Sequence, residues 1–238
     1  MTNNWEVAPT EGWSRRVRLD EVSLSLMGRS RAGGGCAVYV PEIGALFDAG
    51  LECDYSVHHV FVSSRSENST KNLPYICLRN PRVTVHTPAS KACLDFVLCA
   101  NRYFGRYMTD VTVVPCRNEV QITRDKHFVE TFFDLDRIVG FGISQERAKG
   151  GHRSYLVLYL CSNSLLGLDV LARYKYVLAR VSFGQVGPGV RWSELEKVLP
   201  ALCGSKFILT HFGVSFTAGQ FGLVATVLKK YRNVHGIL

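Results

Sequence analysis

The stretch of residues 45–74, ALFDAGLECDYSVHHVFVSSRSENSTKNLP, decides the fold. It contains two short apolar runs, Ala45–Phe47 and His59–Val62, which predict strands because turn-forming or polar residues bound them. The first run ends in the turn Asp48–Ala49–Gly50. The second run leads into Ser63–Asn72, whose polar residues predict a loop.

The neighbouring segments extend this pattern toward the N-terminus. Cys36–Val40 is expected to form a hairpin with Ala45–Phe47, across the turn at Pro41–Gly44. Apolar residues of Val22–Leu26 alternate with polar ones, as in a half-buried strand. The glycine-rich stretch Gly28–Gly35 that follows predicts a loop.

Early hairpins, followed by strands that alternate with helices, predict two sheets covered by helices. We expect an irregular lead-in over residues 1–18 and a single domain over residues 19–238. Further strands are expected at 82–86, 111–114, 119–123, 128–133, 138–143, 155–161, 176–181 and 207–210. Helices are expected at 92–103, 165–172, 193–202 with Ser193 as N-cap, and 217–232.

The composition predicts that the protein has no membrane span. It also predicts acidic partners. The chain has 238 residues, 47% of them hydrophobic, but no run of apolar residues is long enough for a membrane span. The net charge of +8 favours nucleic acid as a partner, because cationic side chains release counterions from phosphates. The eight cysteines form no C-x-x-C pair. We therefore expect an intracellular, reducing compartment, either cytoplasmic or organellar, with mitochondria included.

The order of these segments resembles the metallo-β-lactamase fold, and in particular the short transfer-RNA 3′-end endonucleases, the tRNase Z family. Family members have a strand ending in F-D-x-G, which matches Phe47–Gly50 here. A strand of the type V-F-[IV]-[ST] follows, as in Val60–Ser63, and after a short loop comes L-P, as in Leu73–Pro74. The resemblance implies an αβ/βα sandwich of two mixed sheets flanked by helices.

The loop between these two matches differs from the family in the residues that bind metal. Family members have H-x-H-x-D-H there, and its three histidines and one aspartate hold two zinc ions. In this chain the histidine places carry Ser64, Ser66 and Ser69, and the aspartate place carries Asn68. Hydroxyl and amide groups are poor zinc donors, so the resemblance implies a degenerate metal site.

Three more metal-site positions follow from the resemblance. Asp134 stands where a metal histidine precedes a strand beginning with glycine, and Ser162 stands where a bridging aspartate is usual. His211 lies in Ile208–Phe212, which matches the family's last motif, and it keeps the ligand type. His211 is either a remaining ligand or a structurally hydrogen-bonded histidine, because one ligand cannot hold zinc. A weak divalent-metal site formed by Asp134, Asp136 and His211 is the alternative.

Basic residues suggest where RNA phosphates would bind. They fall near the loop that replaces the metal motif and in a later loop, and they contact phosphates or simply form a solvated face. The candidates are Arg65, Lys71, Arg79, Arg82, Arg147, Lys149 and Arg153.

These features together favour a catalytically inactive tRNase Z-like protein that acts as a binding or scaffold subunit. We expect no cofactor. The expected partner is a protein, either an active paralogue or the subunits of a ribonucleoprotein, with RNA as a candidate and no membrane. The alternative is a metal-dependent RNA hydrolase with a rebuilt active site, although zinc chemistry needs ligands that the recognised motifs lack.

Overall fold

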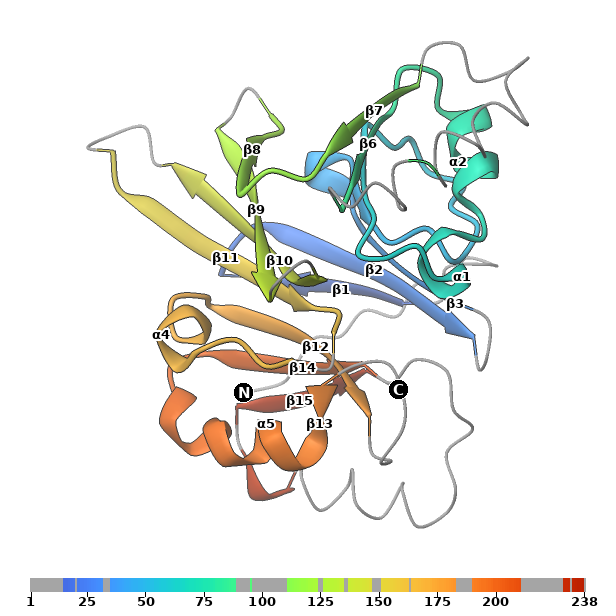
Figure 1. Cartoon of the computed structure of the whole chain (residues 1–238). Helices are drawn as coiled ribbons and strands as arrows, with labels where there is room; N and C mark the ends of the chain where they lie inside the picture. The colour runs from blue at the N-terminus through green and yellow to red at the C-terminus, as the bar shows by residue number, and fades with distance from the viewer. Residues whose placement is uncertain are drawn as a thin grey trace. The chain divides into compact units, whose positions relative to one another are not determined.

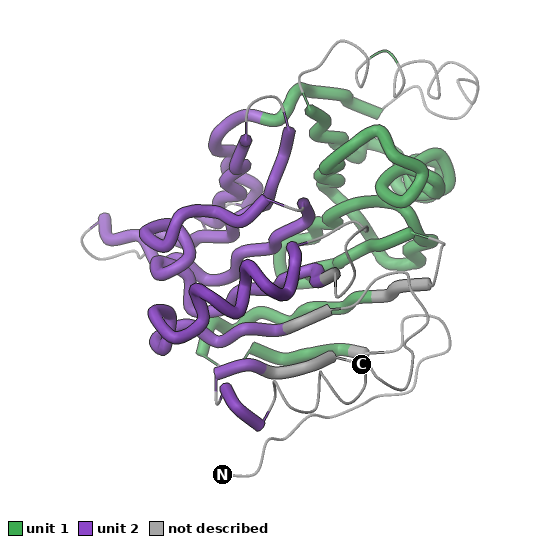
Figure 2. Tube along the Cα trace, turned by 60° about the horizontal axis from the view of Figure 1, so that its bottom comes forward, with its two compact units in different colours: residues 1–116 green, residues 117–238 purple. Residues whose placement is uncertain are grey.

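The chain forms two compact units, residues 1–116 and residues 117–238, which Figure 2 shows in different colours. The single domain expected over residues 19–238 stays a prediction. In the computed structural model the described residues are 15–19, 21–31, 35–88, 95, 111–123, 126–134, 137–146, 151–162, 164–182, 190–210, 229–231 and 233–237.

The first unit is built on one seven-stranded mixed sheet whose strand order follows the chain (Figure 1). Strands β1 to β4 pair antiparallel, and β4 to β7 pair parallel. The strands are β1 (Arg15–Leu19), β2 (Leu24–Arg31), β3 (Gly35–Val40), β4 (Ala45–Phe47), β5 (His59–Phe61), β6 (Thr84–Thr87) and β7 (Thr112–Pro115). The described helices are η1 (Pro41–Ile43), α1 (Glu67–Thr70) and α2 (Leu73–Arg79).

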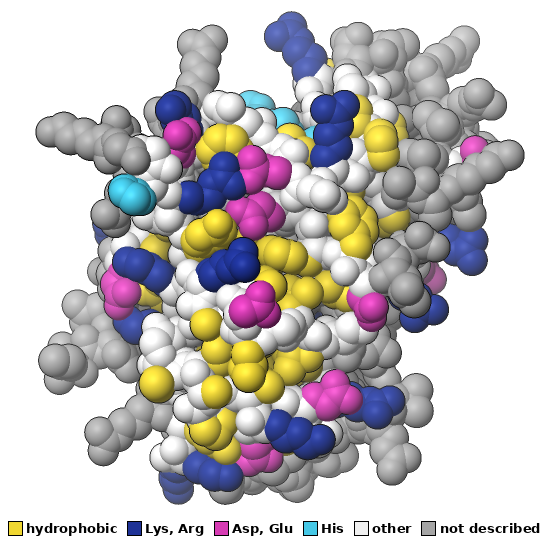
Figure 3. All heavy atoms as spheres, turned by 60° about the vertical axis from the view of Figure 1, so that its left-hand side comes forward, with side chains coloured by type: hydrophobic (Ala, Val, Ile, Leu, Met, Phe, Trp, Pro, Cys, Tyr) yellow, Lys and Arg dark blue, Asp and Glu magenta, His cyan; other side chains and the backbone are white. Residues whose placement is uncertain are grey.

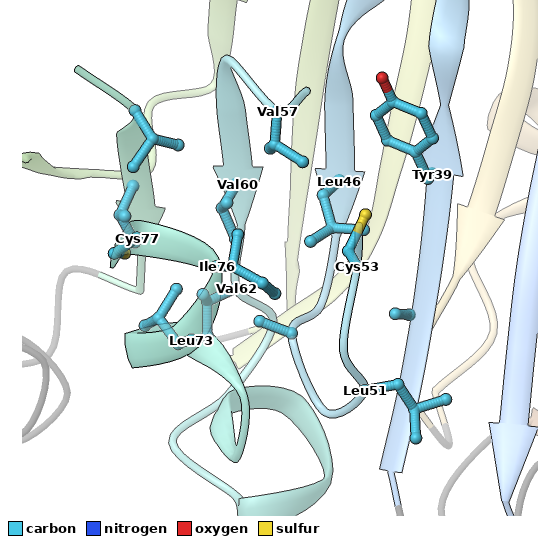
Figure 4. Close-up of a cluster of buried hydrophobic side chains, with 14 of the residues drawn as sticks. Tyr39, Leu46, Leu51, Cys53, Val57, Val60, Val62, Leu73, Ile76 and Cys77 are labelled. Atoms are coloured by element: carbon cyan, nitrogen blue, oxygen red, sulfur yellow. The ribbon is translucent and has the colours of Figure 1, made fainter. Parts of the chain in front are cut away.

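Helix α2 covers one face of this sheet. Its buried residues Leu73, Ile76 and Cys77 belong to the same apolar cluster as Leu46 and Val60 of the strands (Figure 4). Because side chains alternate along a strand, the next residue of each strand points to the opposite face.

The opposite face carries an aromatic stack. Phe47, Phe61 and His86 are register partners on β4, β5 and β6. The rings of Phe61 and His86 lie 4.3 Å apart and nearly parallel. All three side chains are buried, so both faces of these central strands are buried.

The second unit is built on a mixed sheet of the order β15-β14-β12-β11-β10-β9-β8, with β13 paired to β12. Strands β8 to β11 pair antiparallel, and the remaining pairs are parallel. The strands are β8 (Glu119–Gln121), β9 (His127–Asp134), β10 (Arg137–Glu146), β11 (Arg153–Leu160), β12 (Tyr176–Ser182), β13 (Val190–Arg191), β14 (Lys206–Thr210) and β15 (Val234–Ile237). The described helices are α4 (Leu168–Leu171), α5 (Trp192–Val198) and η2 (Leu199–Leu202).

The helices of this unit bury their apolar residues against its parallel strands. Leu171 of α4, Leu195 of α5 and Leu202 of η2 pack in one cluster with Val177 and Phe207 of the sheet. The expected fold class, two mixed sheets flanked by helices, is confirmed. No helix within the described ranges is both long and apolar enough to cross a membrane.

Several expected boundaries were wrong, for local reasons. The expected loop Ser63–Asn72 contains the single-turn helix α1. Strand β2 extends to Arg31 and β3 begins at Gly35, so the loop expected at residues 28–35 is much shorter. Strand β1 begins at Arg15, inside the segment expected to be an irregular lead-in.

The helix expected from Ser193 begins one residue earlier, at Trp192. Arg191 is its N-cap, no side chain caps it, and its last turn is the 3₁₀ helix η2. The closing helix expected at residues 217–232 falls mostly outside the described residues, as does the helix expected at residues 92–103. Strand β15 was not expected.

Close packing at Gly50 holds the turn after β4 against the following loop. A Cβ atom at this position would lie 2.7 Å from the backbone nitrogen of Cys36 and closer still to the carbonyl oxygen of Asn68. Gly50 N–H donates to the carbonyl oxygen of Cys36 over 3.0 Å. Only glycine fits between these two segments, which explains the last position of the F-D-x-G match.

We expect Gly50→Ala to lower the free energy of unfolding by about 3 kcal/mol, because the new methyl group meets backbone atoms that cannot move aside. Gly204→Ala is the control, since a Cβ atom there would have no neighbour within 4 Å, and it should change stability by less than about 1 kcal/mol. Urea denaturation of both variants measures the difference. Equal stabilities would show that the turn tolerates a side chain.

Candidate functional site

Asp48 organises the turn that precedes the loop Ser63–Asn72, which the resemblance predicts to be a degenerate metal-binding loop; it is called the former metal loop below. The backbone of Asp48 is left-handed, with φ of 60°, and its side chain is fully buried. The carboxylate Oδ1 accepts hydrogen bonds from the Ser63 N–H over 2.9 Å and from the Ser63 hydroxyl over 2.8 Å. Cys36 Sγ lies 3.5 Å from Oδ2 as a weaker donor. Asp48 therefore fixes the end of β5 to the end of β4.

The three serines at the histidine places come together. The hydroxyl oxygens of Ser64 and Ser66 are 2.8 Å apart, and they lie 3.3 and 3.4 Å from the hydroxyl oxygen of Ser69. Ser69 also contacts the Ser63 hydroxyl over 3.2 Å. We call Ser63, Ser64, Ser66 and Ser69 the hydroxyl cluster; hydrogen bonds connect it to the buried carboxylate of Asp48.

Backbone hydrogen bonds hold the hydroxyl cluster in place. The Ala49 N–H donates to the carbonyl of Ser69 over 2.7 Å, and the Asn72 N–H donates to the carbonyl of Ala49 over 2.8 Å. The Asn72 side-chain amide donates to the carbonyl of Gly50 over 2.8 Å. The carbonyl of Asn68 accepts the Cys36 thiol over 3.7 Å. The loop is thus bound to the turn along its length.

In the second unit, two of the metal-site positions meet through one further serine. The Ser164 hydroxyl donates to Asp134 Oδ2 over 2.8 Å, and the Ser164 N–H donates to the Ser162 hydroxyl over 3.5 Å. Asp134 and Ser162 therefore lie close together. Ser164, which connects them, was not among the residues predicted from the sequence. His211 and Asp136 lie outside the described residues.

The residues at the metal positions do not fit zinc. Four of them are serines and one is an asparagine, so neutral oxygen donors stand where imidazole and carboxylate groups would be needed. The serine hydroxyls of the loop already bond to one another. Within the described residues, no group of three or more His, Cys, Asp or Glu side chains could hold a metal ion.

Among the candidate phosphate-binding cations that are described, three are paired with carboxylates. Lys71 pairs with Glu67 over 3.5 Å, and Arg79 pairs with Asp54 over 2.8 Å. Arg153 pairs with Glu119 and Glu130 and lies over the ring of Phe128. These pairs reduce the positive charge that each cation offers to RNA.

Arg65 and Arg82 are exposed and form no ion pair within the described part of the chain. Arg147 and Lys149 lie outside the described residues. On the face drawn in Figure 3, basic side chains are interspersed with acidic and hydrophobic ones, so that face carries no continuous basic field.

The sequence analysis did not find a histidine pair in the first unit. His59 Nδ1 and His86 Nε2 lie 3.2 Å apart; His86 is only 3% exposed, and His59 is partly buried. Burial, and to a smaller extent the neighbouring His59, lower the pKa of His86 from 6.5 to about 4. No local pattern in the sequence indicated this pair, because the register that places His86 beside Phe61 joins strands that are apart in the chain.

The second unit contains a hydrogen-bonded polar group around Glu130, which the sequence analysis also did not find. Glu130 accepts hydrogen bonds from Ser144 and Tyr174, each over 3.1 Å. Burial raises the pKa of the Tyr174 phenol, and the charge of Glu130 raises it further. Each of these contacts satisfies a polar side chain, so the group has the features of a structural network.

Comparison with known proteins places the fold in one class. No family model matches the sequence, and no curated protein matches it. Among solved structures, the human short form of tRNase Z is similar, with 14% identity, coverage of 91% of this chain and 89% of that one, and a TM-score of 0.51. The Bacillus subtilis metallo-β-lactamase-fold protein YhfI is also similar, with 11% identity, coverages of 87% and 89%, and a TM-score of 0.56.

A diphosphatase from the PhnP family is similar as well, with 10% identity, coverages of 96% and 85%, and a TM-score of 0.53. At these identities the likeness concerns the fold. The chain has the metallo-β-lactamase fold and is structurally similar to tRNase Z.

Stability should fall as the pH decreases through the range from 6.5 to 4. The folded-state pKa of His86 is lower than its unfolded value, so the unfolded chain binds a proton first on acidification. The stabilising contribution is complete above pH 6.5 and is lost toward pH 4, by about 3 kcal/mol in total. Urea denaturation across this range, with His86→Phe as the variant that keeps an aromatic ring beside Phe61, measures it. If the free energy of unfolding of His86→Phe fell with decreasing pH as steeply as that of the wild type, the pH dependence would belong to other groups.

Proposed function

We propose that this chain is a non-catalytic protein of tRNase Z-like structure that acts as a binding or scaffold subunit in an RNA-processing or ribonucleoprotein complex. The observation that carries the proposal is the hydroxyl cluster. Ser64, Ser66 and Ser69, at the three histidine places, bond to one another and, through Ser63, to Asp48. A loop that satisfies its own polar groups in this way needs no ion to hold its shape.

The donor chemistry supports the same proposal. Hydrolysis in this fold class would need a metal-activated water, and hydroxyl or amide oxygens are poor zinc ligands. The strands and turns that carry these positions are nevertheless intact, since β4, β5 and α1 keep their mutual hydrogen bonds. A folded surface without the donor set suits binding better than hydrolysis.

The charge of the chain supports RNA, or an RNA-bound complex, as a partner. The net charge is +8, and Arg65 lies exposed in the former metal loop. Lys71, one turn further on, pairs with Glu67, but both side chains are more than half exposed. Exposed pairs of this kind contribute little, so Lys71 can exchange Glu67 for a phosphate. The expected protein partner, an active paralogue or a ribonucleoprotein subunit, belongs to the same proposal.

The purified protein should contain zinc, manganese and iron at well below one equivalent, and it should not cleave precursor transfer RNA when these metals are added. The physical reason is the missing donor set at the loop positions. Elemental analysis and a gel-based cleavage assay measure the two properties. Stoichiometric metal together with metal-dependent cleavage would overturn the proposal and favour a hydrolase with a rebuilt site.

Charge reversal should weaken RNA binding. The variant Arg65→Glu/Lys71→Glu should bind RNA roughly tenfold or more weakly than the wild type at moderate salt, with a shallower salt dependence, because two phosphate contacts are lost. Arg173→Glu/Lys230→Glu carries the same change of charge in the second unit, at exposed residues paired with Asp169 and Glu196, and serves as the control. Fluorescence anisotropy measures the RNA affinity of the wild type and of both double variants. Equal weakening in both variants would count against this surface.

A further inference from the structure

The hydroxyl cluster contains four protons, and the contacts around Asp48 direct them inward. A carboxylate has no proton to donate, so the Ser63 hydroxyl donates to Asp48 Oδ1. Because the Ser63 hydroxyl already donates its proton to Asp48, the Ser69 hydroxyl is the donor in its contact with Ser63. The Ser69 oxygen then accepts a proton from either Ser64 or Ser66, whose hydroxyl oxygens lie 3.3 and 3.4 Å from it.

The outer end of the hydroxyl cluster is therefore an acceptor. The short contact between Ser64 and Ser66 uses one of the two remaining protons, and the bond to Ser69 uses the other. Ser66 is exposed and presents lone pairs to solvent. Its hydroxyl has no proton left for a phosphate oxygen, whereas a ligand O–H or N–H finds an acceptor there.

Arg65 has the complementary chemistry. It lies between Ser64 and Ser66 in the chain and is exposed. Its guanidinium carries only donors, in the planar arrangement that suits a phosphate. A loop that presents donors and acceptors side by side suits a ligand with an anionic group close to a hydroxyl group. A ribonucleotide has both, in its backbone phosphate and its 2′-hydroxyl.

We infer that Ser64, Arg65 and Ser66 form a ribonucleotide subsite in which Arg65 contacts a backbone phosphate and Ser66 Oγ accepts the proton of a ribose 2′-hydroxyl. The inference rests on the RNA binding that the proposed function includes, and it adds the sugar as the recognised group. The former metal loop then distinguishes RNA from nucleic acid that lacks a 2′ donor.

A change of the Ser66 side chain removes its own contacts with Ser64 and Ser69 but leaves the path from Ser64 through Ser69 and Ser63 to Asp48 in place. Ser66 is the N-cap residue of α1, but its side chain makes no capping hydrogen bond there. The Thr70 hydroxyl donates to the carbonyl of Ser66, a backbone group that every substitution keeps. Ser66→Ala therefore removes the outer acceptor, and Ser66→Thr is the matched control that retains a hydroxyl.

The test compares single-stranded oligouridylate RNA with its 2′-fluoro and 2′-O-methyl counterparts by fluorescence anisotropy. Both modified strands keep the phosphates and lack the 2′ proton donor. The wild type and Ser66→Thr should bind RNA roughly 3- to 10-fold more tightly than either modified strand, the effect of one hydrogen bond. Ser66→Ala should bind all three strands equally, at the affinity that the wild type shows for the modified strands.

The outcomes separate this inference from the proposed function. Equal binding of RNA and 2′-fluoro RNA by the wild type would overturn the 2′-hydroxyl contact and leave RNA binding in place. A preference for RNA that survives in Ser66→Ala would place the sugar contact elsewhere and also overturn it. Absence of binding to every strand would overturn both the subsite and the RNA component of the proposed function.

Discussion

The structure of the loop Ser63–Asn72 depends on the close approach of Gly50 to the backbone of Cys36 and Asn68. Because no side chain fits there, the turn after β4 lies directly against the loop after β5. Asp48 can then reach Ser63, and the backbone of Ala49 can bond to Ser69. The conformation of the loop is thus determined by backbone packing and by one buried carboxylate.

This arrangement explains how the loop keeps its shape through its own hydrogen bonds. In a metal site, the ion itself holds the ligands together, so losing one ligand weakens the rest. Here the hydrogen bonds of Asp48 and the contacts among three small hydroxyls hold the loop. Serine is small enough to fit, and it both donates and accepts, so a group of serines can satisfy itself. The fold class and the donor set are therefore separate properties of this chain.

The strands that carry the loop could be predicted from the sequence, because each is a short apolar run bounded by a turn. Ala45–Phe47 is β4 as expected, and His59–Phe61 is β5. Helix α1 was not predicted, since a single turn in a polar segment has no apolar periodicity. The burial of His86 was not predicted either, because it depends on the aromatic stack with Phe61. Such burial depends on neighbours distant in the chain, which local patterns do not report.

By itself, the sequence determined which donor atoms stand at the metal positions, because ligand chemistry depends on residue type and order alone. It also indicated the fold, because the flanking strands and glycine turn follow local rules. Only the tertiary structure decided that Ser64, Ser66 and Ser69 converge and that Ser63 connects them to Asp48. This convergence comes from hydrogen bonds between segments apart in the chain, and packing at Gly50 brings those segments together.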